Sequence, residues 1–349
     1  MTDPTLEPPT TSVAREATAL IERLGISANR DLITEIVTTA GELGQDGTDR
    51  LDLKITASAI DEMRDAFLMF APYKDRPKVT IFGSARTAAV DPVYVQTHDV
   101  ARSLADAGWM VVTGAGPGIM LAAMEGAGPA QSIGVSIRLP FESRANDVIH
   151  DDPKHVSMKY FFTRKLMLVK ESKGFIAVPG GFGTLDETLE LLTLQQTGKA
   201  EPTPIVLLDA PGGSFWKGFA SFIDDEVASR GLVAADDLDR VLITDDPQAA
   251  LEEILGFWRN YHSLRWVGKR LVIRLHAAPT AAEVARLNEQ FGDRLLEGEI
   301  VARGPLAAEV SSDDHLDLAR LVMVYDPFKV GDLHRLIRAI NALESAPPG

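Results

Sequence analysis

The segment Pro179-Gly180-Gly181-Phe182-Gly183-Thr184-Leu185-Asp186-Glu187 combines a glycine-rich turn with a nearby carboxylate. An apolar run at 175–178 precedes it and leucines at helical spacing follow it, which predicts a strand, a turn and a helix. The first amides of a helix lack intrahelical partners and favour an anion, and glycines let a phosphate approach them closely. The segment therefore predicts a phosphate site, with Glu187 beside it, at Gly180, Gly181, Gly183 and Thr184.

A purely structural interpretation fits the same residues. Thr184 and Glu187 have the Thr-x-x-Glu spacing of a capping box, in which each side chain accepts a hydrogen bond from the other residue's backbone. Under this interpretation Glu187 only caps the helix and the glycines only form a turn. If Glu187 acts in catalysis, its carboxylate must turn away from the cap toward a ligand.

Two further turns of small residues follow predicted strands. Strand 79–82 leads into Gly83-Ser84-Ala85-Arg86, and strand 109–113 leads into Gly114-Ala115-Gly116-Pro117-Gly118-Ile119-Met120. Ile119 stands where a dinucleotide fingerprint needs its third glycine, and no Gly-Lys-Ser/Thr of a P-loop follows any glycine turn. These departures argue against a nicotinamide or flavin dinucleotide, and we expect no cofactor.

Basic residues precede the strand that carries the main turn. Arg164 and Lys165 lie in segment 158–167, which is predicted to be helical, and they form either a solvated helix face or part of a phosphate site. The chain has no cysteine, and its seven histidines form no His-x-x-x-His or Ser/His/Asp arrangement. We interpret each histidine as surface or satisfied core, so no metal site is predicted.

These loops need a scaffold that brings them together. Apolar strands at 79–82, 109–113, 133–137, 175–178, 205–208 and 241–244 alternate with helices that begin near Pro92, Pro117, Val156, Thr184, Phe215 and Pro247. Such alternation predicts an α/β, Rossmann-like open parallel sheet with helices on both faces. Ligands bind such sheets beyond the carboxyl ends of the strands, which is where the three glycine turns lie.

The chain is predicted to have four parts. We expect a disordered tail at 1–12, a helical N-terminal segment at 13–74, a Rossmann-like nucleotide-binding catalytic domain at 75–262, and a small α+β domain of unknown role at 263–349. In the last part we expect a βαββα order, with strand 271–275, helix 281–291, strands 299–302 and 321–325, and helix 330–343.

Composition narrows the functional classes. The 349 residues are 45% hydrophobic and 24% charged, as in ordinary soluble proteins. A formal net charge of -15 argues against nucleic-acid binding, which relies on basic surface. Residues 1–9 lack a signal-peptide pattern and no apolar run approaches the length of a membrane span, so we expect cytoplasmic residence and no membrane partner.

Four motifs in order resemble the Lonely Guy family of nucleoside 5′-monophosphate phosphoribohydrolases, which release cytokinins and are often mislabelled lysine decarboxylases. The motifs are 83–86, 114–120, 161–165 and 179–187, and the continuation to Lys199 is similar to the longer branch of the family. The resemblance covers about residues 75–262. No lysine motif supports a pyridoxal-phosphate decarboxylase.

The resemblance implies a hydrolase that cleaves AMP, an N6-substituted AMP or a cytokinin nucleotide into free base and ribose 5-phosphate. Arg164 and Glu187 correspond to the family's catalytic pair, and the glycine turn from Gly180 to Thr184 to its 5′-phosphate site. A carboxylate suits this reaction because it stabilises an oxocarbenium-like ribose. Further nucleotide contacts are expected at Gly83, Ser84, Arg86, Gly114, Gly116, Gly118, Met158 and Lys165.

Other features of the reaction remain open at the sequence level. Asp186 and Lys165 are candidates for the group that protonates the departing base. Ala115 and Leu121 depart from the pattern of many relatives, which puts substrate contacts there in doubt. The resemblance implies a homodimer or a larger homo-oligomer. The alternative function is a non-catalytic nucleotide sensor or carrier of a phosphorylated ligand on the same fold.

Overall fold

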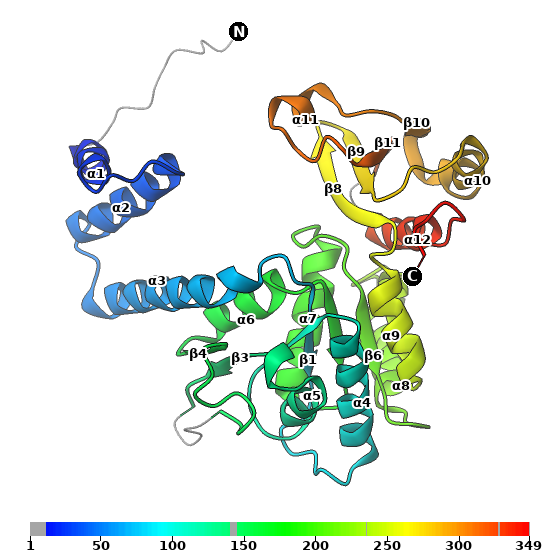
Figure 1. Cartoon of the computed structure of the whole chain (residues 1–349), viewed down its shortest axis with the longest axis horizontal. Coiled ribbons are helices and arrows are strands. Elements are labelled where there is room, and N and C mark those ends of the chain that lie inside the picture. Colours follow the sequence, from blue (N-terminus) through cyan, green and yellow to red (C-terminus); the bar gives the residue numbers. More distant parts are fainter. Residues whose placement is uncertain (1–11, 140–144, 235, 327–328, 349) are drawn as a thin grey trace. The chain divides into compact units, whose positions relative to one another are not determined.

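The computed structural model describes residues 12–139, 145–234, 236–326 and 329–348. The chain divides into two compact units, one ending at Arg64 and the other beginning at Asp65. In the first unit, helices α1 (Ser12–Arg23) and α2 (Arg30–Gln45) pack against each other. Helix α3 (Arg50–Phe70) continues from the first unit into the second (Figure 1). The predicted helical character of this region is confirmed.

The second unit contains a parallel sheet of seven strands. These are β1 (Lys78–Phe82), β2 (Met110–Thr113), β3 (Ser132–Ile137), β4 (His155–Met158), β5 (Gly174–Ala177), β6 (Ile205–Leu208) and β7 (Val241–Thr244). Their spatial order is β4-β3-β2-β1-β5-β6-β7, and every neighbouring pair is parallel. The strand order reverses at β1, which lies between β2 and β5, so ligands are expected at this switch point.

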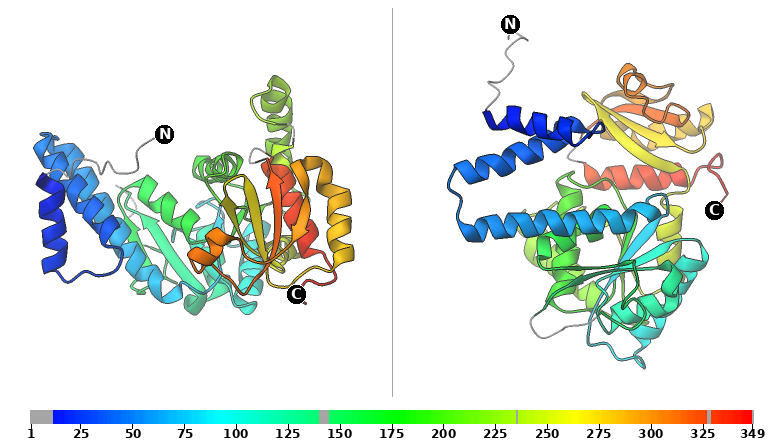
Figure 2. Two further views of the ribbon diagram at one scale, coloured as in Figure 1. Left: turned by 90° about the horizontal axis from the view of Figure 1, so that it is seen from above. Right: turned by 60° about the vertical axis from the view of Figure 1, so that its left-hand side comes forward.

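Helices cover both faces of this sheet (Figures 1 and 2), as predicted. Alternate strand residues point to opposite faces, so Ile176 packs with α4 (Pro92–Asp106), α5 (Ile119–Ala127) and α9 (Pro247–Gly256). Its neighbours Phe175 and Ala177 pack instead with α7 (Phe182–Gln196) and α8 (Phe215–Phe222). The α/β, Rossmann-like fold class is confirmed.

One predicted helix start is wrong. Residues from His155 to Met158 form the edge strand β4, and helix α6 begins later and spans Phe161–Lys170. β4 pairs with β3 on one side only, and three of its four residues are only partly buried. Because β4 is an edge strand and only partly buried, its sequence does not need the continuous apolar run that is typical of the central strands.

The C-terminal part holds an antiparallel sheet of four strands, β8 (Tyr261–Val267), β9 (Arg270–Leu275), β10 (Leu295–Ala302) and β11 (Ala319–Tyr325), in the spatial order β10-β11-β9-β8. Helices α10 (Ala281–Phe291) and α12 (Val330–Asn341) share a hydrophobic core with this sheet. Strand β8 was not predicted, and it spans the position proposed as the domain boundary, between 262 and 263. The short helix α11 (Ala307–Ser311) lies between β10 and β11 in the chain.

Short helical turns complete the described elements. They are η1 (Ala71–Tyr73), η2 (Pro129–Gln131), the π-helical turn η3 (Ile223–Val227), η4 (Ala228–Arg230), η5 (Asp237–Arg240) and η6 (Gly292–Arg294). Helix α12 packs against η5, and Arg338 pairs with Glu253 of α9 at 2.7 Å. The small antiparallel sheet is thereby joined to the helices beside the parallel sheet.

Candidate active site

The glycine-rich turn leads from β5 into the N-terminus of α7. Gly181 is the residue that precedes the helix, and no side chain caps it. Thr184 therefore lies inside the first turn, where it is 4% exposed, and the capping box expected from the sequence is wrong. The reason is local, because glycines let the helix begin two residues before Thr184.

Three strand-end loops meet at this turn. The amide of Ser84, after β1, donates to the carbonyl of Pro179 at 3.3 Å, and the amide of Ile119, after β2, donates to the carbonyl of Ser84 at 3.0 Å. Gly118 has a φ of +64°, and a Cβ at that position would clash with the Ser84 carbonyl. The loops after β1, β2 and β5 are thus in direct contact, as their positions in the sequence predicted.

Arg164 reaches the same place from α6. Its Nε donates to the carbonyl of Val135 in β3 at 3.0 Å, and its Nη1 lies 3.7 Å from Oε1 of Glu187. The guanidinium also lies against Gly114, where a Cβ would clash with Nη2. The two side chains are 14% and 11% exposed. The structure therefore brings together the arginine and the glutamate that the sequence singled out.

The electrostatic state of this pair is unusual. Burial raises the pKa of Glu187 above its ordinary value, and the positive charges of Arg164 and Lys165 only partly oppose this effect. Burial also lowers the pKa of Arg164, against the opposing effect of Glu187. Their separation of 3.7 Å exceeds normal hydrogen-bond length, so neither charge is fully compensated by the other.

The two candidates for the leaving-group acid face each other. Lys165 Nζ lies 2.8 Å from Asp186 and 3.0 Å from Glu190. Burial lowers the pKa of Lys165, but the hydrogen bonds from it to these carboxylates outweigh burial and leave the pKa raised. The Asp186 side chain is 57% exposed. Both groups are therefore engaged in an ion pair on the α6 and α7 surfaces.

The remaining predicted contacts take different places. Met158 is fully buried at the end of β4, where its carbonyl accepts from the amide of Arg138 at 2.7 Å. Arg86 is exposed, and its amide donates to Oγ of Ser84 at 3.0 Å. Gly83 packs so closely on Val178 and Ile119 that a Cβ would clash with both. Of these predicted contacts, Met158 and Gly83 are therefore packed against other residues, whereas Arg86 is exposed.

A cavity of about 570 Å³ opens beside Arg164. It includes the predicted residues Gly114, Gly116 and Arg164, and its size falls in the range of small-molecule sites. Residues from β3, β4 and the loop between them form its opposite side. The lining residues are Ala85, Gly114, Ala115, Gly116, Met120, Ser136, Ile137, Arg138, Leu139, Ala145, His150, Asp151, His155, Ser157, Phe161 and Arg164.

Two histidines that were predicted to be surface or satisfied core, His150 and His155, line this cavity. Nδ1 of His150 lies 2.7 Å from a carboxylate oxygen of Asp151, and Nε2 of His155 lies 2.9 Å from Oγ of Ser136. Burial, with a smaller effect of His150, lowers the pKa of His155 despite the nearby Asp151. No spacing motif links these residues, because a sheet edge and a loop bring them together. Asp151, with a φ of +62°, marks the sharp turn in that loop.

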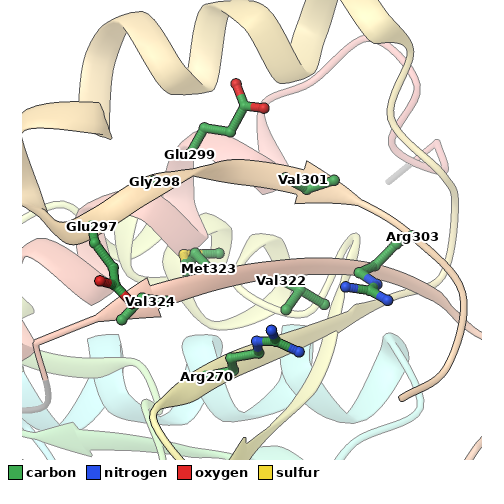
Figure 3. A pocket seen from close by; sticks show the side chains of 9 residues that line it. All are labelled: Arg270, Glu297, Gly298, Glu299, Val301, Arg303, Val322, Met323 and Val324. Carbon is green, nitrogen blue, oxygen red and sulfur yellow. The ribbon is translucent and has the colours of Figure 1, made fainter. Parts of the chain in front are cut away.

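Another cavity, of about 390 Å³, lies on the C-terminal sheet (Figure 3). Arg270, Arg303, Glu297 and Glu299 surround valine side chains on β10 and β11 there (Figure 3). None of the predicted site residues lines it. Its mixture of opposite charges and valines provides no grouping of catalytic residues comparable with the cavity beside Arg164.

Metal-binding clusters and membrane-spanning helices are absent from the described part of the chain. Within it, no group of three or more histidine, aspartate or glutamate side chains is placed to hold a metal ion. No helix there combines the length and the apolar character needed to cross a membrane.

Comparisons with known proteins agree with the motifs. A family model described as possible lysine decarboxylase matches residues 118–254. A cytokinin riboside 5′-monophosphate phosphoribohydrolase from Mycobacterium marinum is 30% identical over 156 residues, which are 44% of this chain and 80% of the relative. The rice enzyme of the same name, from Oryza sativa subsp. japonica, is 42% identical over 81 residues, which are 23% of this chain and 31% of the relative.

A solved structure covers a similar share of the chain. The molybdenum cofactor carrier protein from Chlamydomonas reinhardtii has 23% identity and a TM-score of 0.36, and the match covers 50% of this chain and 94% of that one. The sequence relationship to the mycobacterial enzyme, over four fifths of its length, is the stronger observation. Together with the ordered motifs, it shows that the chain belongs to the Lonely Guy family of cytokinin riboside 5′-monophosphate phosphoribohydrolases.

Proposed function

We propose that this protein hydrolyses the N-glycosidic bond of a purine or cytokinin nucleoside 5′-monophosphate, releasing the free base and ribose 5-phosphate. One observation carries the proposal: the buried carboxylate of Glu187 lies 3.7 Å from Arg164, on the helix that begins at the glycine-rich turn. A turn that binds phosphate and a carboxylate on the same helix correspond to the two ends of a ribose 5-phosphate group, the turn to the phosphate and the carboxylate to C1′.

The 5′-phosphate is proposed to bind at the N-terminus of α7. No side chain caps this terminus, so the amides of Phe182, Gly183 and Thr184 can donate to phosphate oxygens, and the helix dipole favours the negative charge. Gly181 and Gly183 have open space around the positions of a Cβ. Phosphate can therefore approach the backbone closely at these two glycines.

Glu187 is proposed to act at the anomeric carbon. In the reaction, water adds to C1′, the bond from C1′ to the base nitrogen breaks, and the base leaves with a proton. The ionised carboxylate stabilises the positive charge that develops on the ribose and orients the attacking water. Because burial raises the pKa of Glu187, the charge of Arg164 is needed to favour the ionised form.

The base is proposed to occupy the cavity beside Arg164. Met120, Ile137, Leu139 and Phe161 supply apolar surface there, which suits a purine ring and an apolar N6 substituent. His150 and His155 line the same cavity and can exchange a proton with a departing base. We therefore propose an adenine-type nucleotide, with or without an N6 group, as the substrate.

The test compares Glu187→Gln with Glu190→Gln, a matched change one turn further along α7. Purified proteins are incubated with AMP, N6-isopentenyl-AMP, IMP and CMP, and ribose 5-phosphate is assayed. We expect Glu187→Gln to lower kcat by about 10³-fold, in line with the loss of one preorganised electrostatic group, and Glu190→Gln to retain most activity.

The same experiment separates catalysis from carriage of a phosphorylated ligand. A carrier would hold AMP in a stoichiometric complex for hours, and no substrate in the panel would yield ribose 5-phosphate. Unchanged turnover in Glu187→Gln would refute the role of that carboxylate. Activity confined to N6-isopentenyl-AMP would narrow the proposal to cytokinin activation.

A homodimer or larger homo-oligomer remains part of the proposal. Large apolar side chains on α6 and α7 are exposed, among them Phe161, Phe162, Leu166 and Leu189. Clusters of this kind often mark protein interfaces. Light scattering on the full chain and on Leu166→Glu tests this surface, since the substitution should reduce the measured mass if the surface is buried between subunits.

A further inference from the structure

A separate cavity of about 530 Å³ lies at the opposite edge of the parallel sheet. Lys74 and Arg76 precede β1, Trp109 precedes β2, and Lys173 precedes β5, so this side of the cavity is built at the amino ends of the strands. The glycine turns lie at their carboxyl ends. The cavity is therefore distinct from the one proposed for the nucleotide.

The C-terminal part of the chain supplies the other side. Trp258, His262 and His276 line the cavity there. The indole Nε1 of Trp258 donates to the carbonyl of Lys173 at 2.7 Å, and Nζ of Lys173 lies 4.8 Å from the centre of the Trp258 ring. These contacts fix the position of Lys173 relative to the C-terminal sheet. The cavity wall is thus held by specific bonds from both sides.

The charge of this cavity contrasts with the chain as a whole. Lys74, Arg76 and Lys173 are cationic, yet within the described residues none of them forms an ion pair with a carboxylate. Arg76 instead donates to the carbonyl of Gly108 at 3.4 Å and to the side chain of Gln131. Asp75 is the carboxylate in the lining, and Glu201 acts on Lys173 from nearby. Three cations thus gather in a chain with a net charge of -15.

The two histidines add hydrogen-bonding groups. The ring centres of His262 and His276 are 5.3 Å apart, and the ring centre of His315 lies 4.7 Å from that of His262. Burial and the neighbouring His315, His276, Lys173 and Arg274 lower the pKa of His262 to about 4. Both imidazoles can donate N–H groups to an anion, and an anion among these cations would compensate their mutual repulsion.

We propose that this cavity binds the phosphate group of a small phosphorylated ligand. The three cations supply charge-assisted donors for phosphate oxygens, and each of the two neutral imidazoles can add one N–H donor. The proposal gives the C-terminal part of the chain a binding role, since His262 and His276 come from it. It does not depend on the hydrolase reaction, because no residue of this cavity belongs to the proposed active site.

Tryptophan fluorescence and calorimetry on the full chain test the proposal. Trp109 and Trp258 line this cavity, whereas the cavity beside Arg164 contains no tryptophan. Inorganic phosphate, pyrophosphate and AMP serve as probes, and Gly181→Asp serves to block the turn before α7. In that background we expect at least one probe to change the fluorescence and bind with one site per chain.

The double variant Lys74→Gln, Lys173→Gln, made in the same background, should weaken that binding at least tenfold. The double variant Lys217→Gln, Lys269→Gln, which removes one exposed lysine from α8 and one from the turn between β8 and β9, is the charge-matched control and should leave the binding unchanged. Tighter binding of AMP than of phosphate would identify a nucleotide as the ligand. Absence of binding by all three probes, or equal binding in the double variant at Lys74 and Lys173, would overturn the proposal. Neither readout uses base release, so failure here is separate from failure of the hydrolase.

Discussion

Two buried glutamates in this chain, each close to an arginine, have pKa values shifted in opposite directions. In the C-terminal part, Glu309 is fully buried and accepts hydrogen bonds from Arg274 at 2.8 Å, from Arg320 at 3.2 Å and from the Leu306 amide at 3.0 Å. Burial alone would raise the pKa of Glu309, but these bonds outweigh it and leave the pKa lowered. In the candidate site, burial of Glu187 dominates and its pKa is raised.

The difference separates a structural ion cluster from a candidate catalytic pair. Glu309 has its hydrogen-bonding capacity filled by the protein itself, which stabilises one arrangement of β9, α11 and β11. Glu187 has one arginine, Arg164, at 3.7 Å, and that arginine lines a cavity of about 570 Å³. Perturbed carboxylates that remain incompletely paired in a cleft are candidates for chemistry, whereas fully bonded ones usually serve the fold.

The largest expected effect concerns stability at Glu309. Glu309→Ala leaves the buried guanidiniums of Arg274 and Arg320 without their shared partner, which typically costs about 3–5 kcal/mol. Urea unfolding monitored by circular dichroism measures this loss, with Glu299→Ala on the exposed part of β10 as control. A loss no larger than that of the control would show that the Glu309 cluster is not a stabilising element.

A smaller effect is expected from introducing a side-chain hydrogen-bond acceptor at the N-terminus of α7, where no side chain caps the helix. In Gly181→Asp the new carboxylate can accept from the first-turn amides of α7, as residues before a helix commonly do, and it repels phosphate. We expect kcat/KM to fall about 100-fold, a loss of about 2.7 kcal/mol, while the free energy of unfolding changes by only a few tenths of a kcal/mol.

Gly181→Ala is the matched control for that variant. Gly181 has a φ of -88° and open space at the Cβ position, so alanine fits without strain and introduces no charge. Its kcat/KM should fall less than that of Gly181→Asp, because the methyl group narrows the space for phosphate but does not repel its charge. Equal losses in both variants would indicate that the glycine itself, and not the free amides, is needed.

The smallest expected effect is on stability at Glu187 and depends on pH. The folded pKa of Glu187 is raised, so its ionisation costs stability as pH rises from the ordinary glutamate range through the raised value. Glu187→Gln should therefore gain stability over wild type across that interval, by about 1 kcal/mol or less.

Glu309 should show the opposite slope. Its folded pKa is lowered, so its contribution is present above the ordinary glutamate range and disappears as pH falls through the lowered value. Urea unfolding of both variants and wild type between pH 3 and pH 8 compares the two slopes. Parallel slopes would remove the electrostatic distinction between the two groups.

Much of the fold followed from the sequence because the central strands are buried on both faces. Continuous apolar runs such as 205–208 carry a strong signal, and the residues of β6 are all buried. β4 is a short edge strand and gave no such signal. β8 forms a two-residue hairpin with β9 through Gly268, and its partly buried residues mix polar and apolar types.

The candidate site was predictable where local sequence determines geometry. The turn at Gly181 and the placement of Arg164 before β5 follow from strand and helix order. The role of Thr184 could not be predicted. The helix begins two residues before Thr184, so Thr184 lies inside the first turn and forms no capping box. His150 and His155 could not be found, because only the pairing of β3 with β4 brings them to the cavity.

The uncapped start of α7 has a consequence for the order of events in turnover. Under the proposed function, these amides bind the 5′-phosphate, a group that hydrolysis leaves unchanged. Ribose 5-phosphate therefore stays bound through its phosphate after the bond breaks, whereas the base is no longer covalently attached to it. The base is free to leave first, and the sugar phosphate competes with the next substrate for the same helix terminus.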